Sequence, residues 1–234
     1  MAYDPRTVAL SADLFHPPLP LDPRPVQALH NEMFVARTPA YTSFNVTPQG
    51  PVLSNPPVAP NSVSQVAFRE DRVQIREEVT SLTVEDFAAR VGEVGQKLAT
   101  ARSIPVYVGQ VVTLRSLVNP QGYDDARQYL KEGMFRFEDE PETFGRPANL
   151  FGLRMVFPAS EDETTTFGLR IESFAQDPRS LFVEVQGTFG PVLTQRDLSP
   201  LSERVLETYR FLTTRALSFI KRFDASNRGP GPGR

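Results

Sequence analysis

The histidines are the residues most often used in catalysis and metal binding, but in this chain they are few and poorly placed. His16 precedes two prolines, and His30 is followed two positions later by Glu32, a spacing that does not place both side chains on one face of a helix. A metal site needs more ligands than this pair, and the chain has neither an HExxH motif nor a cysteine. A serine–histidine–acid triad would also lack its usual GxSxG turn. We therefore expect no metal site and interpret both histidines as ordinary surface or half-buried residues.

Two acidic runs could supply the paired carboxylates that hydrolysis or Mg²⁺ binding requires. One run consists of Glu138, Asp139, Glu140 and Glu142, and the other of Glu161, Asp162 and Glu163. Carboxylates need a pocket that shifts their pKa values before they serve as acid and base. Both runs lie in predicted loops beside prolines and threonines, which favours a solvated surface. The chain contains no glycine-rich phosphate-binding motif, and we expect no cofactor.

Phenylalanine is the most distinctive residue type of the chain, which has seventeen phenylalanines and no tryptophan. Several of them lie on predicted strands of the second half. Alternate side chains of a strand point to opposite faces of a sheet, and the predicted helices can cover only one face. An uncovered apolar face would meet the other half of the chain, a second subunit or an apolar ligand. The candidate interaction surface consists of Phe167, Phe174, Phe182 and Phe189.

The element that must position these residues is a long helix predicted over residues 199–223. We expect the Ser199 side chain to cap its first turn and Pro200 to occupy its first position. Lys221 and Arg222 fall in the last turn, where the helix dipole favours cations. Apolar residues recur every three or four positions, so the helix should pack on a sheet through one face. That stripe consists of Leu201, Val205, Tyr209, Leu212, Ala216, Ile220 and Phe223.

The rest of the chain shows the order strand, helix, three strands, helix in each half. The first half predicts strands at 7–15, 41–47, 64–68 and 72–80, helices from 23 and from 83, and a proline-rich loop or irregular edge at 48–61. The second half predicts strands at 106–117, 149–157, 164–174 and 181–189, a helix at 123–135 and the terminal helix. The repeated order of elements indicates an internal duplication.

Shifting the sequence by 101 positions against itself places identical residues of the two predicted helices on each other, which supports the duplication over a short stretch. The matched residues are Gln27, Leu29, Met33 and Phe34, which fall on Gln128, Leu130, Met134 and Phe135. We predict an α+β fold made of a duplicated β-α-β-β-β-α unit, with antiparallel sheets covered by helices and a long C-terminal helix. Residues 1–105 form the first half, 106–224 the second half and 225–234 a flexible tail.

Composition restricts the class of protein further. The formal net charge is −3 and both signs are interspersed, which argues against a dedicated nucleic-acid-binding protein. Residues 1–6 are not followed by the long apolar run of a signal peptide, and no stretch approaches 18 apolar residues. We expect a soluble, cytoplasmic protein without membrane association.

Three stretches resemble a sporadically distributed bacterial family of uncharacterised proteins of about 250 residues. They are FREDRVQI at residues 68–75, VGQVVTLRSLV with Arg115, and the pair LRIESF and LFVEV before the terminal helix. The resemblance implies no established activity and no catalytic residues. Its sporadic distribution suggests an accessory or defence-associated component of a bacterial cell.

Three functions stay open from the sequence. The first is a non-enzymatic protein-binding or scaffold protein that assembles with itself or with a protein partner, since catalytic motifs are lacking and apolar strand surface is in excess. The second is a binding module for a small apolar ligand, held between the sheet and the long helix. The third is a carboxylate-dependent hydrolase or nuclease that uses the acidic loops.

Overall fold

The computed structural model describes residues 3–36, 41–136, 145–146, 148 and 150–224. Its helices are α1 (Arg24–Val35), α2 (Val84–Ala101), α3 (Ala126–Gln128) with its π-helical continuation η1 (Tyr129–Phe135), and the C-terminal series α4 (Pro200–Arg210), π-helical η3 (Phe211–Ala216) and α5 (Leu217–Arg222). Its strands are β1 (Arg6–Phe15), β2 (Ser43–Thr47), β3 (Gly50–Ser54), β4 (Val63–Phe68), β5 (Arg72–Glu78), β6 (Val106–Tyr107), β7 (Gly109–Val118), β8 (Gly152–Phe157), β9 (Thr166–Ser173), β10 (Leu181–Phe189) and β11 (Val192–Leu193). Within the described ranges, no helix is both long enough and apolar enough to cross a bilayer.

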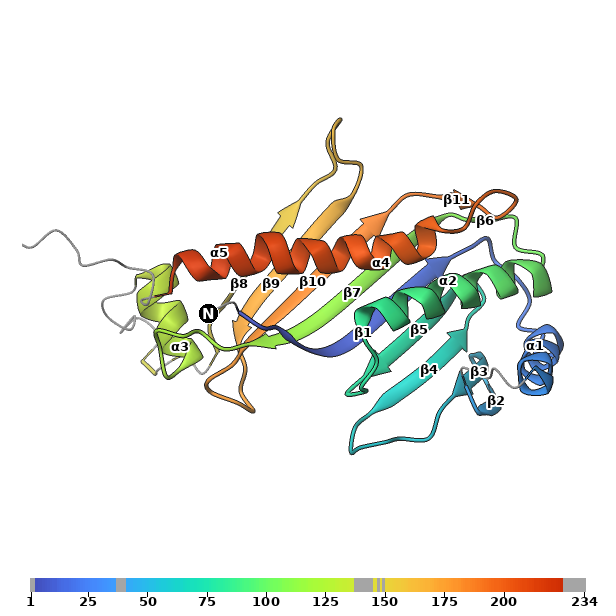
Figure 1. The fold of residues 1–234 in the computed structure, drawn as a ribbon, viewed down its shortest axis with the longest axis horizontal. Helices are drawn as coiled ribbons and strands as arrows, with labels where there is room; N and C mark the ends of the chain where they lie inside the picture. The colour runs from blue at the N-terminus through green and yellow to red at the C-terminus, as the bar shows by residue number, and fades with distance from the viewer. Residues whose placement is uncertain (1–2, 37–40, 137–144, 147, 149, 225–234) are drawn as a thin grey trace, which may run out of the picture.

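Nine strands form a single sheet in the order β2-β3-β4-β5-β1-β7-β10-β9-β8, in which neighbours pair antiparallel. β1 and β7 lie side by side in the middle of the sheet (Figure 1), and Leu10 is opposite Leu114. The two short strands β6 and β11 pair separately. The strands of both predicted halves therefore belong to one continuous sheet.

Strand alternation divides this sheet into an apolar helix face and an open face. On β1, Leu10, Ala12 and Leu14 are buried, whereas Ser11 and Asp13 between them are partly exposed. α2 and the C-terminal helix series run across the side that carries the buried residues (Figure 1). The buried residues of α1, α3 and η1 also join the core on this side, so none of the described helices covers the open face.

The C-terminal helix series connects two core clusters. Leu201 and Val205 of α4 pack with the β1, β5 and α2 side chains of the first cluster. Leu212 of η3 and Ile220 of α5 pack with the β9 and β10 side chains of the second cluster. All four side chains are fully buried, as the predicted apolar stripe requires. The long terminal helix is therefore confirmed and holds both parts of the core together.

Both sides of the sheet run outward from its centre in a similar order. From β1 the order is β5, β4, β3, and from β7 it is β10, β9, β8, so each central strand is followed in space by a three-strand meander. β2 has no counterpart on the other side among the described strands. The mixed, mostly antiparallel architecture is confirmed, whereas the duplicated unit with a boundary at residues 105 and 106 stays a prediction.

The structure corrects several local predictions. Residues 48–61 are not all loop, because β3 begins at Gly50, which has a φ of 121° that an L side chain rarely adopts. The strand predicted at 106–117 is divided into β6 and β7. The Ser199 side chain donates to Asp197 and makes no cap hydrogen bond to the helix, although Pro200 does occupy the first helical position. The predicted tail, 225–234, lies outside the described residues.

Candidate binding site at the outer edge of the sheet

Both histidines are buried. His16 and His30 are 2% and 9% exposed, so both are more buried than expected, and neither Nε2 atom has a hydrogen-bond partner. Burial lowers the pKa of His16, which favours its neutral form. His30 packs its ring against Phe34 and Phe44. Within the described ranges, no three His, Cys, Asp or Glu side chains are grouped closely enough to hold a metal ion.

The described acidic run is solvated. Glu161, Asp162 and Glu163 are exposed in the connection between β8 and β9, where Ser160 and Glu163 hydrogen-bond to each other and close a turn. This turn therefore gives no support to a buried acid–base pair. The members Glu138, Asp139, Glu140 and Glu142 of the other run lie outside the described residues.

The four phenylalanines of the candidate interaction surface do not share one surface. Phe167 and Phe189 are buried on the helix face, where their rings meet edge to face at 6.3 Å between centroids. Phe174 and Phe182 are half-buried and stack on each other, also at 6.3 Å. Phe182 alternates with the buried residues of β10 and therefore lies on the open face. The strand phenylalanines therefore divide between the two faces, as alternation predicts, and of these four only Phe174 and Phe182 are accessible.

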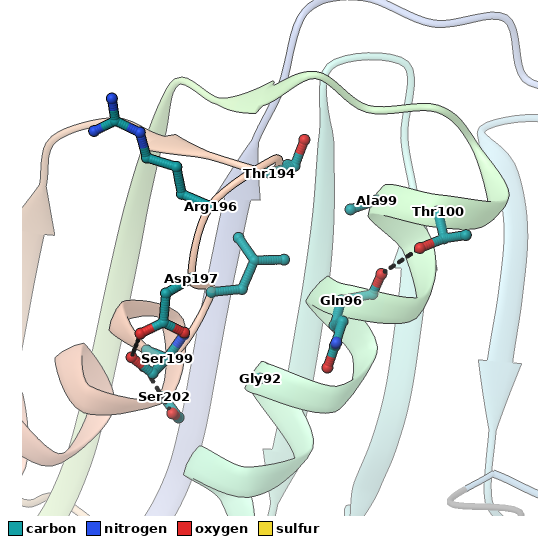
Figure 2. A pocket seen from close by; sticks show the side chains of 10 residues that line it. Gly92, Gln96, Ala99, Thr100, Thr194, Arg196, Asp197, Ser199 and Ser202 are labelled. Atoms are coloured by element: carbon teal, nitrogen blue, oxygen red, sulfur yellow. Dashed lines mark hydrogen bonds between the residues drawn. The ribbon is translucent and has the colours of Figure 1, made fainter.

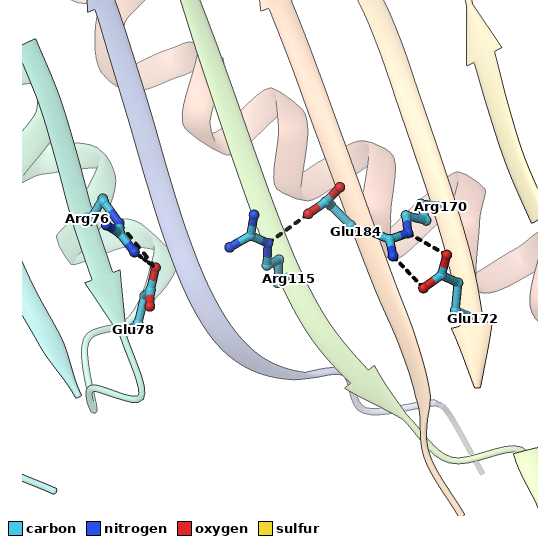
Figure 3. A network of polar contacts seen from close by, with 6 residues as sticks. All are labelled: Arg76, Glu78, Arg115, Arg170, Glu172 and Glu184. Carbon is cyan, nitrogen blue, oxygen red and sulfur yellow. Dashed lines mark hydrogen bonds and ion pairs between the residues drawn. The ribbon is translucent and has the colours of Figure 1, made fainter. Parts of the chain in front are cut away.

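The open face is polar, which corrects the expectation of a surplus apolar face. Figure 3 shows its charged side chains on neighbouring strands: Arg115 of β7 donates to Glu184 of β10 at 2.7 Å, and Arg170 of β9 forms two hydrogen bonds of 2.6 Å to Glu172. Arg76 and Glu78 make a similar pair on β5. Such a surface is compatible with water, so it needs no second layer to cover it.

A polar cleft of about 500 Å³ lies between α2 and the start of α4 (Figure 2). Its most prominent carboxylate, Asp197, already accepts hydrogen bonds from the Ser199 amide at 2.9 Å and the Ser199 hydroxyl at 2.6 Å. The Arg196 side chain points away from Gln96 and Ser202 in this view. The polar groups of the cleft are thus used in local structure and do not converge on a common point.

A groove of about 500 Å³ lies between the β8–β9 hairpin and the C-terminal helix series. Phe211 stacks on Phe167 at 4.3 Å between ring centroids, and Phe157 lies 5.5 Å from the same Phe211 ring. Met155 and Phe219 extend the apolar lining, which also includes the side chains Glu163, Arg215 and Arg222. We call this feature the aromatic groove. The groove therefore combines large apolar side chains with polar and charged ones, a mixture that is found in binding sites.

The helix that forms one wall of the groove is π-helical from Phe211 to Ala216. Two consecutive threonines in this segment donate hydrogen bonds to backbone carbonyls of the preceding turn. The hydroxyl of Thr213 donates to the Tyr209 carbonyl at 3.1 Å, and that of Thr214 donates to the Arg210 carbonyl at 2.7 Å. Single π-helical turns are rare overall, but those that occur often lie at functional sites. In this protein the π-helical segment begins at Phe211, an aromatic residue that lines the groove.

β8 forms the outer edge of the sheet beside the groove, because no described strand pairs with its outer side. The Phe151 carbonyl accepts a hydrogen bond from the Ser173 amide at 2.9 Å. Along a strand of an antiparallel pair, residues whose backbone groups point toward the partner strand alternate with residues whose backbone groups point away from it. The amides and carbonyls of Leu153, Met155 and Phe157 therefore bond to β9. The amides and carbonyls of Gly152, Arg154 and Val156 consequently point outward, away from β9.

This edge strand is also apolar and accessible. Val156 is 58% exposed and Phe157 is 40% exposed. Proteins usually protect such edges with charges, prolines or bulges, because an exposed edge pairs readily with another chain. β8 has one charged residue, Arg154, and no proline within its bounds. The candidate site is therefore the β8 edge together with the aromatic groove.

Sequence reasoning did not find this site. The alternation of apolar residues located β8 approximately, but which strands form the edges depends on the order of strands in the sheet. Phe211 was placed on the terminal helix without a role, and the helical period gave no sign of the π turn. The chain matches no protein-family model and no curated protein with which it was compared.

Proposed function

We propose that the protein is a non-enzymatic binding protein that captures an extended segment of a protein partner against β8. The observation that carries this proposal is the apolar outer edge of β8, with which no described strand pairs and which lies directly beside the aromatic groove. An added strand would satisfy the outward amides and carbonyls of Gly152, Arg154 and Val156, which supply affinity without regard to sequence. Its alternate side chains would cover Met155 and Phe157 and enter the groove, which supplies specificity.

Selection of peptides from a displayed random library on the immobilised protein tests this proposal. Amide hydrogen exchange, measured with and without a selected peptide, should show new protection at Arg154 and Val156. The intervening amide of Met155 already bonds to β9 and should change less. A selected peptide that protects only residues outside β8 and the groove would contradict the proposed site.

Val156→Pro gives a matched structural test, because it removes an outward amide and leaves the hydrogen bonds between β8 and β9 in place. We expect peptide affinity to fall by roughly tenfold or more, since the ring also blocks the incoming strand. Val156→Thr keeps the amide and a branched side chain, and should bind within about twofold of the original protein. Equal binding by the proline variant, at an unchanged melting temperature, would exclude strand addition.

A second candidate function is the binding of a small apolar ligand in the aromatic groove. The observation that favours it is half-buried Phe211, which stacks on the buried Phe167 ring and lines a groove of about 500 Å³. Native mass spectrometry of the protein purified gently from its host would show an added mass of a few hundred daltons. Phe211→Ala should remove that mass while Val156→Pro preserves it, and the opposite result would favour the strand-addition proposal.

We also infer that the two halves of the sheet arose by duplication of one β-α-β-β-β-α unit. The similar strand order on both sides of β1 and β7 supports this inference. Both central strands are also followed in the chain by a helix and three more strands, with β2 as an addition to the first half.

A further inference from the structure

The charges on the open face alternate from strand to strand until they reach β8. Arg115 of β7 is opposite Glu184 of β10, and Glu184 is opposite Arg170 of β9. The next residue in this row is Arg154, which is opposite Arg170 and repeats its positive charge. Like charges directly opposite each other destabilise a pair of strands. The row therefore ends on a cation beside another cation, at the free edge.

Arg154 also differs from its neighbours in lacking a partner. Arg170 is held by Glu172, and Arg115 is held by Glu184. Arg154 is exposed and makes no hydrogen bond or ion pair with any of the residues that the structure describes. Its guanidinium is consequently available to a group that arrives along the outer side of β8.

We propose that the segment captured at β8 carries an acidic residue opposite Arg154, flanked on both sides by apolar residues. This inference rests on the proposed function and specifies its partner. The residue opposite Arg154 faces the open side, since paired residues of neighbouring strands share a face. Its two neighbours point to the helix face, opposite Leu153 and Met155, and Met155 lines the aromatic groove. The partner is therefore an extended segment of the type apolar–acidic–apolar.

A second copy of this chain does not meet that requirement. If two copies of β8 pair with their helix layers on the same side, open-face residues meet open-face residues. Arg154 of one copy would then be opposite Gly152, Arg154 or Val156 of the other. None of these residues carries a negative charge. The charge row thus favours a different protein as the partner.

Three synthetic peptides of alternating valine and threonine, identical except for a central glutamate, glutamine or lysine, test the inference by calorimetry at low salt. An opposite-charge pair and a like-charge pair across strands differ by about 0.4 to 2 kcal/mol, so the glutamate peptide should bind roughly twofold to thirtyfold more tightly than the lysine peptide. The difference should shrink at high salt because exposed charges are screened.

Arg154→Glu should reverse the order, so that the lysine peptide binds best. Arg69→Glu makes the same change of net charge at the turn between β4 and β5, outside the site, and should leave the order unchanged. If the three peptides bind equally but Val156→Pro abolishes binding, the acidic partner is excluded and strand addition stands. If no peptide binds, and none can be selected from the library, the proposed function fails as well.

Discussion

The buried ion pair between Glu77 and Arg90 gives the sharpest prediction about stability. Glu77 of β5 lies on the helix face, and its side chain is 2% exposed. Its Oε1 atom accepts hydrogen bonds from Arg90 of α2 at 2.5 Å, Ser64 at 3.0 Å and Tyr41 at 3.3 Å. Arg90→Met keeps much of the packing but leaves a buried carboxylate with only two neutral donors.

Removing one partner of a buried pair typically costs about 3–5 kcal/mol, because the other charge loses its compensation. The Arg90 side chain is 19% exposed, so water can replace part of the interaction and we expect about 3 kcal/mol. For a chain of this size that corresponds to a fall in melting temperature of roughly 6–12 °C. Chemical denaturation followed by circular dichroism at pH 7 would measure the free energy of unfolding directly.

The pair Arg76 and Glu78 supplies the control, because the same type of contact occurs on the open face with side chains 35% and 22% exposed. Arg76→Met should cost less than about 1 kcal/mol. Adding Glu77→Gln to Arg90→Met should recover part of the loss, since no uncompensated charge remains. If Arg90→Met costs no more than Arg76→Met, the reasoning about the buried carboxylate is refuted.

Three other predictions concern the core, a buried histidine and a buried aspartate. Leu212→Ala should cost roughly 2–5 kcal/mol, because the side chain is fully buried, whereas exposed Arg215→Ala should barely change the melting temperature. Because burial lowers the pKa of His16 below 6.5, the unfolded chain takes up the proton first, so stability should be constant above neutral pH and fall below about pH 6.5; a urea-denaturation series should show a shallower fall for His16→Gln, and an identical fall would contradict the assignment. Asp224→Ala should cost roughly 2–4 kcal/mol, since the carboxylate is fully buried and accepts hydrogen bonds from Tyr3 and from the amides of Gln121 and Gly122; a melting temperature within 2 °C of the original protein would be inconsistent with this.

The sequence predicted those elements whose signals are local. The second helix begins at the predicted position, where Thr83 caps α2 by accepting from the Asp86 amide, and the range of β10 matches the predicted strand. β3 was missed because glycine and proline normally interrupt strands, although Gly50 uses its unusual backbone geometry to begin one. The π turn was missed because no residue type marks it: threonines bond to the preceding turn in the regular helix α4 as well.

The candidate site could not be predicted because it depends on contacts between distant parts of the chain. Alternation predicted that the strand phenylalanines divide between the two faces, but only the packing of Phe211 on Phe167 shows which ring is covered. The exposed state of β8 depends on the position of that strand at the end of a nine-strand order. Arg154 acquires its meaning only from Arg170 across the ladder. None of these relations is encoded in the local spacing of residues.

The C-terminal helix series has a consequence for how the protein is made. Leu201 and Val205 belong to the same cluster as Leu10, Leu14 and other side chains of the first hundred or so residues. During synthesis, that cluster therefore lacks one of its walls until residue 205 has left the ribosome, which at 5–20 residues per second is a delay of about 5–20 s after residue 105 emerges. The nascent chain exposes an incomplete apolar surface throughout this interval. We therefore expect a chaperone to bind it early, and both core clusters to become complete in one late cooperative step.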